Sequence, residues 1–246
     1  MGCRASMSAI RSHISGDRAI KVTLIALILA DTAFIGANSA ARAALELFPD
    51  SLWIVRSNIH FVDVWDDRSF AEAFNTIKLA AIPALLFLLW TRVREPIYLA
   101  WFSIFLFAVV DDAGSLHERG GNLTEGWLGP NPGLGYRGQD VGELATWVLV
   151  GVLLLPLLVA SYRRSCRLDR RLGRWIAVCF AGLAVFAVGV DMSHPLWPAG
   201  FDIRRGILED GGEMLAVSLT CAVVLLIVRH RGDIAQALGE PSPSSA

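Results

Sequence analysis

Six apolar runs, each nearly free of charge, constrain this chain more than any other feature of its sequence. A run of about 20 apolar residues crosses a bilayer as a helix, since a helix satisfies its own backbone hydrogen bonds. Charged residues make up 18% of the chain, against about 25% in a typical soluble domain. The sequence therefore predicts an all-α membrane protein, a six-helix transmembrane bundle, and excludes soluble enzymes, disordered chains and nucleic-acid-binding modules.

The predicted spans follow the apolar runs along the chain. They cover residues of about 22–43, 70–90, 96–113, 141–161, 175–190 and 206–228. The chain then divides into an N-terminal segment 1–21, a single transmembrane domain 22–230 and a disordered tail 231–246. Polar loops are expected at 44–69, 114–140, 191–205 (outer) and 162–174 (basic, inner).

Basic residues are concentrated on one side of the predicted bundle. Fourteen of the 22 Lys and Arg residues fall in the N-terminal segment, the turn at 92–94, the 162–174 loop and the C-terminal stretch from residue 229 onward. Basic residues accumulate in cytoplasmic loops, so this bias places both termini in the cytoplasm. We expect a multi-pass protein of the cell inner (plasma) membrane, in contact with membrane lipids.

Acidic residues show the opposite bias, because 18 of the 23 lie within the spans or on the outer side. Ten of these 18 form five groups at outer span ends, in the motifs FAEAFNT, VDDAGSLHE, GQDVGEL, VDMSHP and LEDGGEM. Ionisable residues in membrane helices are costly and are usually functional. A helix bundle would bring several of these groups together.

Carboxylates and imidazoles at one depth in the membrane suit a divalent metal ion: zinc, iron or manganese. Glu209 and Glu213 are spaced i, i+4 and so project from one helix face. Carboxylates in close proximity would repel one another unless a cation neutralised them. The candidate metal ligands are His117, Glu209, Glu213, Asp111, Asp112, Asp191 and Asp210.

The same residues have structural alternatives. The S-x-x-E motif at 69–72 and the D-x-x-E motif at 140–143 resemble helix caps. Arg205 and Glu209, spaced i, i+4, suit an ion pair. Asp31, in the middle of the first span, suits either a hydrogen-bond network or a functional role.

Three of these motifs carry a resemblance to a known family. FAEAFNTIKLAAIPALLFLL, GSLHE and GQDVGEL resemble, in the same order, helices of the alkaline ceramidases. These enzymes belong to the CREST superfamily, with the progestin and adipoQ receptors. The resemblance covers about a third of the chain and implies a zinc-dependent hydrolase of lipid amides. The chain departs from the family in having Glu209-x-x-x-Glu213 where the family has His-x-x-x-His, Gly142 where it has Asp, and six predicted spans rather than seven.

A second resemblance is to uncharacterised bacterial multi-pass membrane proteins. They share the Asp-rich segment followed by His-Glu, and the pattern Glu-Asp-x-x-Glu-Met. This resemblance implies a membrane location and no particular activity.

The sequence favours a metal-dependent hydrolase of lipid amides or esters. Glu118 or Glu143 would be the general base for a metal-activated water, and Ser115 would donate to the developing oxyanion. The alternatives are a cation or proton transporter that uses Asp31, and an assembly scaffold whose acids only cap helices and form ion pairs. The oligomeric state is left open.

Overall fold

The computed structural model describes residues 17–48, 64, 69–133, 135–198 and 200–237. These residues form helices and no strand, which confirms the predicted fold class. The elements are α2 (Arg18–Leu47), α4 (Phe70–Val93), α5 (Pro96–Gly114), α6 (Leu116–Leu128), α7 (Gly138–Arg164), α8 (Arg167–Ala184), the π-helical η2 (Val185–Val190), the 3₁₀-helical η3 (Asp191–Leu196) and α9 (Asp202–Ala237).

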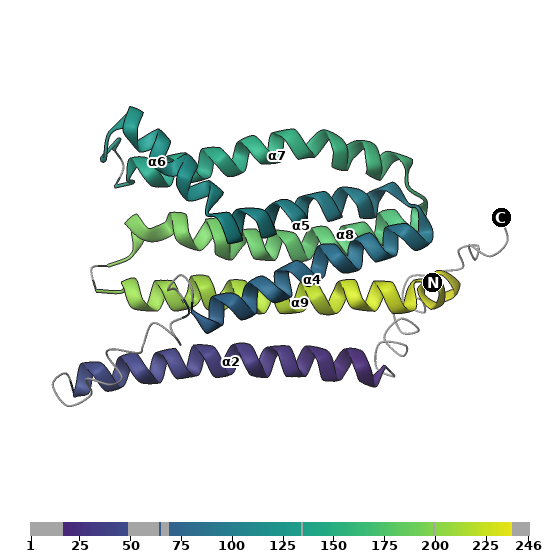
Figure 1. Cartoon of the computed structure of the whole chain (residues 1–246), viewed down its shortest axis with the longest axis horizontal. Coiled ribbons are helices and arrows are strands. Elements are labelled where there is room, and N and C mark those ends of the chain that lie inside the picture. Colours follow the sequence, from purple (N-terminus) through teal and green to yellow (C-terminus); the bar gives the residue numbers. More distant parts are fainter. Residues whose placement is uncertain (1–16, 49–63, 65–68, 134, 199, 238–246) are drawn as a thin grey trace.

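Six helical segments in this part of the chain are long and apolar enough to cross a membrane. Five lie in α2, α4, α5, α7 and α9, and the sixth runs from Arg167 through α8, η2 and η3 to Leu196. The chain is therefore a multi-pass membrane protein. In Figure 1 these helices run along the long axis of the molecule.

The start of α2 and the end of α9 lie at the same end of the bundle (Figure 1). There the Asp17 carboxylate accepts a hydrogen bond of 2.9 Å from Arg229. We call this the basic end, after Arg18, Arg92, Arg163, Arg167 and Arg229, and the opposite end the acidic end. The location of the basic end in the cytoplasm stays a prediction from the positive-inside rule.

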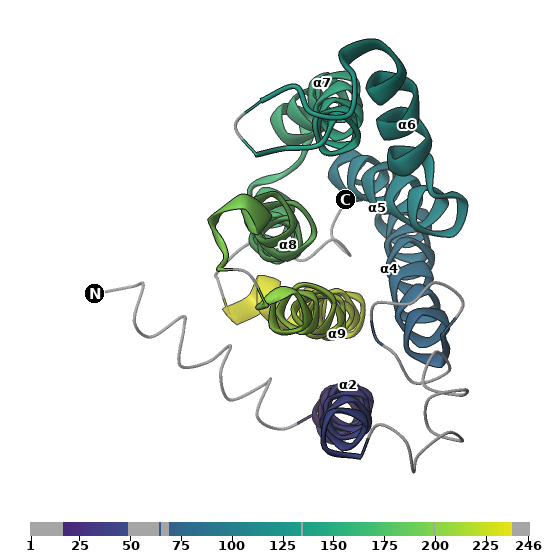
Figure 2. The same cartoon turned by 90° about the vertical axis from the view of Figure 1, so that its left-hand side faces the viewer.

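The core is formed around α9, which packs against α2, α4 and α8 (Figure 2). Fully buried apolar side chains from four helices meet there, among them Leu86, Phe105, Ile176 and Val224. By contrast, α7 leaves many apolar side chains exposed, as expected for a helix that faces lipid. It packs on α5 and α6 rather than on α8, the next helix in the chain.

Several helices extend beyond the predicted spans at the basic end. The expected inner loop 162–174 is mostly helical, because α7 ends at Arg164 and α8 begins at Arg167. The helix α9 likewise continues to Ala237, into the segment expected to be disordered. Helices continue readily into the interfacial region, where arginine side chains reach water while their apolar stems cover the helix.

The acidic end also differs from the expected loops. The outer loop 114–140 contains the helix α6, and the loop 191–205 contains η3 and the start of α9. Most of the predicted loop 44–69 lies outside the described residues, as do residues 1–16 and 238–246. The extra helix α6 matters because it carries part of the candidate site.

Candidate functional site

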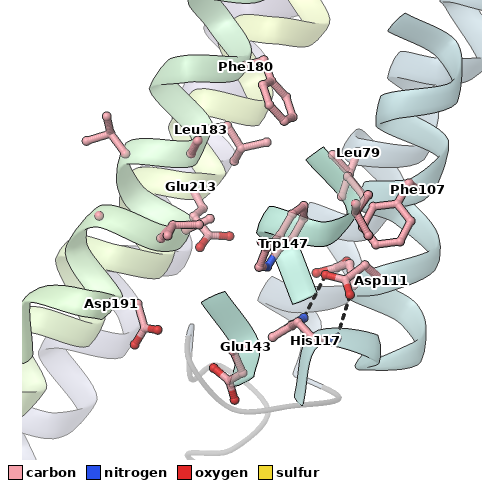
Figure 3. Close-up of a pocket in the computed structure, with 18 of the residues that line it drawn as sticks. Leu79, Phe107, Asp111, His117, Glu143, Trp147, Phe180, Leu183, Asp191 and Glu213 are labelled. Carbon is pink, nitrogen blue, oxygen red and sulfur yellow. Dashed lines mark hydrogen bonds and ion pairs between the residues drawn. The ribbon is translucent and has the colours of Figure 1, made fainter. Parts of the chain in front are cut away.

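A cavity of about 1020 Å³ opens between two groups of helices at the acidic end (Figure 3). Residues of α4, α5, α6 and α7 form one side, and residues of α8, η2, η3 and α9 form the other. All ten residues predicted as ligands or catalytic groups line it: Asp111, Asp112, Ser115, His117, Glu118, Glu143, Asp191, Glu209, Asp210 and Glu213. The five acidic motifs therefore face one space.

His117 and Asp111 form the most defined contact in the cavity (Figure 3). The Asp111 carboxylate lies 2.8 Å from His117 Nδ1 and also accepts a hydrogen bond of 2.8 Å from the His117 backbone N–H. The bond to Asp111 raises the pKa of the His117 imidazole above its usual value. With Nδ1 engaged, Nε2 is the ring nitrogen left to meet a ligand, which is how metal-binding and catalytic histidines are commonly oriented.

Ser115 joins α5 to α6 in a left-handed conformation, with φ 47° and ψ 46°. A residue with a side chain rarely adopts this conformation, which costs about 1 kcal/mol or more. The sharp turn brings the first residues of α6 back over the end of α5, where Asp111 reaches His117. Ser115 thus shapes the site through its backbone, and its hydroxyl also borders the cavity.

A close crossing of α6 and α7 places Glu143 on the same side as His117. A Cβ atom on Gly142 would lie 2.7 Å from the Gly121 Cα atom and 2.5 Å from the Thr124 Cβ atom. Only glycine fits at such a crossing, as in other membrane helix pairs. Glu143 itself accepts a hydrogen bond of 2.8 Å from Gln139.

The opposite side of the cavity carries acids from η3 and α9. Arg205 contacts Asp191 at 3.3 Å and Glu209 at 2.8 Å, so the predicted Arg205–Glu209 ion pair is confirmed. Among the described residues, no side chain forms a hydrogen bond or ion pair with the Glu213 carboxyl. The Oδ1 atom of Asn75 is also buried without a partner. These two groups leave acceptor oxygens available to a ligand.

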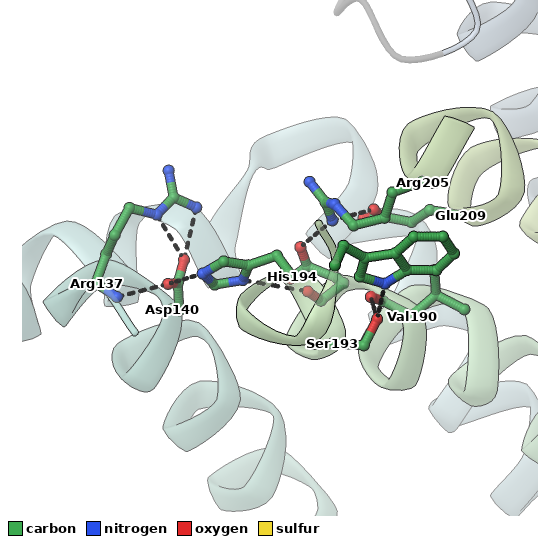
Figure 4. Close-up of polar contacts among 9 residues, drawn as sticks. Arg137, Asp140, Val190, Ser193, His194, Arg205 and Glu209 are labelled. Carbon is green, nitrogen blue, oxygen red and sulfur yellow. Dashed lines mark hydrogen bonds and ion pairs between the residues drawn. The ribbon is translucent and has the colours of Figure 1, made fainter. Parts of the chain in front are cut away.

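A polar network joins α7 to η3 at the acidic end (Figure 4). Asp140 accepts hydrogen bonds from Arg137, including its backbone N–H at 2.7 Å, and lies 3.4 Å from His194. Asp140 therefore helps to cap α7, but from the third helical position behind Arg137 rather than as the first residue of the predicted D-x-x-E motif. The Ser69 hydroxyl likewise accepts a hydrogen bond of 3.0 Å from the Glu72 backbone N–H. At the acidic end, the cavity lies between α7 and the span that follows it, and the contact between Asp140 and His194 connects the two.

The remainder of the cavity is apolar and extends toward the middle of the bundle. Its apolar lining on α7 runs from Leu144 to Leu158, a rise of about 21 Å at 1.5 Å per residue. One leaflet, with its headgroups, is about 20–22 Å deep. Val148 and Val185 line the cavity on its two sides, yet they are 56% and 58% exposed. The cavity therefore opens sideways, toward the region that lipid occupies.

The metal site that the sequence predicts stays a prediction. Among the described residues, none of the ten belongs to a group of three whose ligand atoms lie within 4.8 Å of one another. A catalytic zinc ion takes three protein ligands, whereas magnesium and manganese accept several waters. The donor chemistry of the cavity thus fits a hard, partly hydrated cation better than zinc.

Comparison with known proteins gives a family and no activity. The family model described as Domain of unknown function (DUF8692) matches residues 19–227, which include the residues that line the cavity. The chain belongs to this family. No curated protein and no solved structure matches it. The resemblance to alkaline ceramidases stays a prediction.

At the basic end of this DUF8692 domain, Glu95, Cys166 and Asp169 offer ligand atoms within 4.8 Å of one another. Their contacts favour a structural role. Arg231 binds Asp169 through two hydrogen bonds of 2.8 and 2.6 Å, and Tyr98 donates a third. Burial raises the pKa of the Cys166 thiol to about 11, which keeps it protonated. The cluster therefore joins α5, α8 and α9, and its carboxylate is already neutralised.

Lys78 was not among the residues predicted to be important. It is buried in the DUF8692 domain, where it contacts Asp31. The Lys78 ammonium contacts the Asp31 carboxylate at 2.6 Å, and the Ser218 hydroxyl donates to the same carboxylate at 2.6 Å. Asp31 thus belongs to a hydrogen-bond network, one of the two roles considered for it. The signal available was a lone lysine in an apolar span, which requires an acidic partner.

Proposed function

We propose that this protein is a membrane hydrolase that takes a lipid amide or ester from the bilayer into the cavity at the acidic end. One observation carries the proposal: the cavity has an apolar part about one leaflet deep and is lined with carboxylates at its other end. A lipid whose chain occupies the apolar part would place its carbonyl near His117. The sideways opening gives such a lipid a path that avoids water.

His117 is the proposed general base. Its Nε2 atom would take a proton from a water that attacks the lipid carbonyl carbon, and would return the proton to the leaving amine or alcohol. The products are a fatty acid and the free amine or alcohol. Asp111 acts as a positioning residue that fixes the ring and stabilises its protonated form. Ser115 could donate its hydroxyl proton to the oxyanion, and Glu143 or Glu118 is the alternative base.

The proposal includes a divalent cation, because acidic side chains outnumber basic ones around the cavity and a cation would neutralise their charge. Glu213 and Asn75 would be its ligands, since each has an oxygen atom that no described side chain occupies, while His117 Nε2 stays free to act as the base. Asp112, Asp191, Glu209 and Asp210 lie close enough to line the same space. When bound, the cation would lower the pKa of a coordinated water and polarise the carbonyl.

The transport and scaffold alternatives receive less support from the geometry. A transport path through Asp31 would have to continue from the cavity, but neither Asp31 nor Lys78 lines it. A scaffold would pair each acid locally, as Arg205 pairs Glu209. Glu213 has no such pairing, and its carboxyl faces the cavity in Figure 3.

The experiment is release of fatty acid by the full chain, purified in detergent and returned to bilayers. The substrates are N-palmitoylethanolamine and a monoacylglycerol, with manganese, zinc or a chelator. We compare the wild type with His117→Ala and Glu213→Gln, and use Glu95→Gln as the matched control at the basic end. Metal content is measured in parallel by plasma mass spectrometry.

We expect hydrolysis that requires the metal, falls at least a hundredfold in His117→Ala and is retained in Glu95→Gln. Bound metal should fall in Glu213→Gln and be retained in His117→Ala. Absence of hydrolysis with both substrates under every metal condition, in a folded protein, would refute the hydrolase. Equal metal content in all four proteins would refute the cation site.

A further inference from the structure

We propose that Phe180, Leu158 and Trp101 form a partition that limits the length of the acyl chain the cavity accepts. The inference rests on the proposed function only in that a lipid chain occupies the cavity. It concerns which chain lengths bind, and it holds whether or not hydrolysis follows.

A second cavity lies beyond the apolar end of the first. It has a volume of about 260 Å³ and continues between α7 and α8 toward the basic end. Its lining reaches Arg163 on α7 and Arg174 on α8, and is otherwise almost entirely apolar. The two cavities therefore follow one another along the same pair of helices.

Few side chains separate the two cavities. Among the described residues, Leu158 alone lines both cavities. Phe180 lines the first and Trp101 lines the second, and their ring centroids are 5.8 Å apart. Figure 3 shows Phe180 at the end of the first cavity opposite His117 and Glu143. The barrier consists of these side chains packed against one another.

The partition is held in place by the core. The Phe180 ring packs edge-on against Phe105, with centroids 5.7 Å apart, and Phe105 is fully buried. A ring fixed on two sides cannot swing away without opening a void, which cores resist. We therefore expect the first cavity to have a firm end rather than one that yields to a longer chain.

Removing the Phe180 ring would join the cavities. On α7 the second cavity adds the rise from Leu158 to Arg163, about 7–8 Å. Each methylene group transferred from water into an apolar site improves affinity, measured against the free lipid in water, about fourfold. In the wild type this gain should stop at the chain length that reaches Phe180, and in Phe180→Ala it should continue for several more methylene groups.

The test measures binding of saturated N-acylethanolamines, from octanoyl to arachidoyl, to the full chain by native mass spectrometry. The variants are Phe180→Ala and, should that protein misfold, Leu158→Ala on the other side of the partition. Phe87→Ala is the matched control, because Phe87 is 44% exposed on α4 and lines neither cavity.

We expect the wild type and Phe87→Ala to share one chain length at which affinity stops rising, and the partition variants to shift it to longer chains. An unchanged limit in folded Phe180→Ala and Leu158→Ala would overturn the partition while leaving lipid binding intact. Failure of the wild type to bind any member of the series would instead refute the proposed function, and the partition with it.

Discussion

Asp111 binds His117 twice across the turn between α5 and α6. One carboxylate oxygen accepts the His117 backbone N–H at 2.8 Å, and the other lies 2.8 Å from the ring Nδ1. The first contact satisfies a backbone donor in the first turn of α6, which has no partner within its own helix. The second fixes the orientation of the ring. A single buried carboxylate therefore stabilises the fold and prepares the site.

Replacing Asp111 should affect both properties. We expect Asp111→Ala to lower the free energy of unfolding by about 1–3 kcal/mol, because the His117 backbone N–H loses its acceptor. His117→Gln keeps the backbone contact and should cost less. Both are measured by denaturant unfolding in detergent micelles. Equal losses in the two variants would show that the backbone contact contributes nothing.

The crossing of α6 and α7 gives a second prediction. In Gly142→Ala the new methyl group would meet the Gly121 Cα atom at 2.7 Å, and overpacking of this kind costs about 1–3 kcal/mol. The matched control is Gly36→Ala on α2, where a Cβ atom would meet nothing within 4 Å. There alanine should be neutral or stabilising, since it favours helix. Similar melting temperatures for the two variants would contradict the close crossing.

The fold and the common position of the acids could be predicted because they depend on the order of residues along each helix. Hydropathy locates the spans, and spans in alternating directions bring Asp111, Glu143, Asp191 and Glu213 to one end. The structure places these residues around one cavity. The sequence supplied their depth in the bundle and nothing about the distances between them.

The remainder depends on contacts between helices, which a single sequence does not specify. The pairing of Lys78 with Asp31 requires that α2 and α4 approach the same face of α9. The helix α6 depends on the left-handed Ser115, a conformation that serine seldom adopts. The cavity itself arises because α7 packs on α5 and α6 and leaves a space beside α8.

The contacts of Asp17 predict a pH dependence at the basic end. Hydrogen bonds from His230 and Arg229 hold the pKa of the Asp17 carboxyl well below its usual 3.8. A depressed pKa contributes stability that is present above the unfolded value and is lost as the pH falls through the folded value. Asp17→Asn removes the charge and keeps a residue able to cap α2. We expect its melting temperature to lie below that of the wild type at neutral pH.

The difference between the two proteins should shrink as the pH falls below 3.8, where the unfolded wild type takes up a proton and the folded one still holds its charge, and it should vanish once the pH falls through the folded pKa. The measurement is a series of thermal scans over pH. Ionic strength is held constant, because the Asp17 contacts lie near the surface and salt screens them. A difference that persists unchanged into strong acid would assign the effect of the substitution to capping rather than to charge.

The buried pair of Lys78 and Asp31 gives the last prediction. Lys78 is 4% exposed and Asp31 is not exposed, so removing either partner leaves an uncompensated charge inside the bundle. Lys78→Met and Asp31→Leu should each lower the free energy of unfolding by about 3–5 kcal/mol. The double variant should recover much of this loss, since apolar residues of similar volume can replace a buried ion pair. A full double-mutant cycle by denaturant unfolding measures the coupling, and losses that simply add would show that α2 is not held to α4 by this pair.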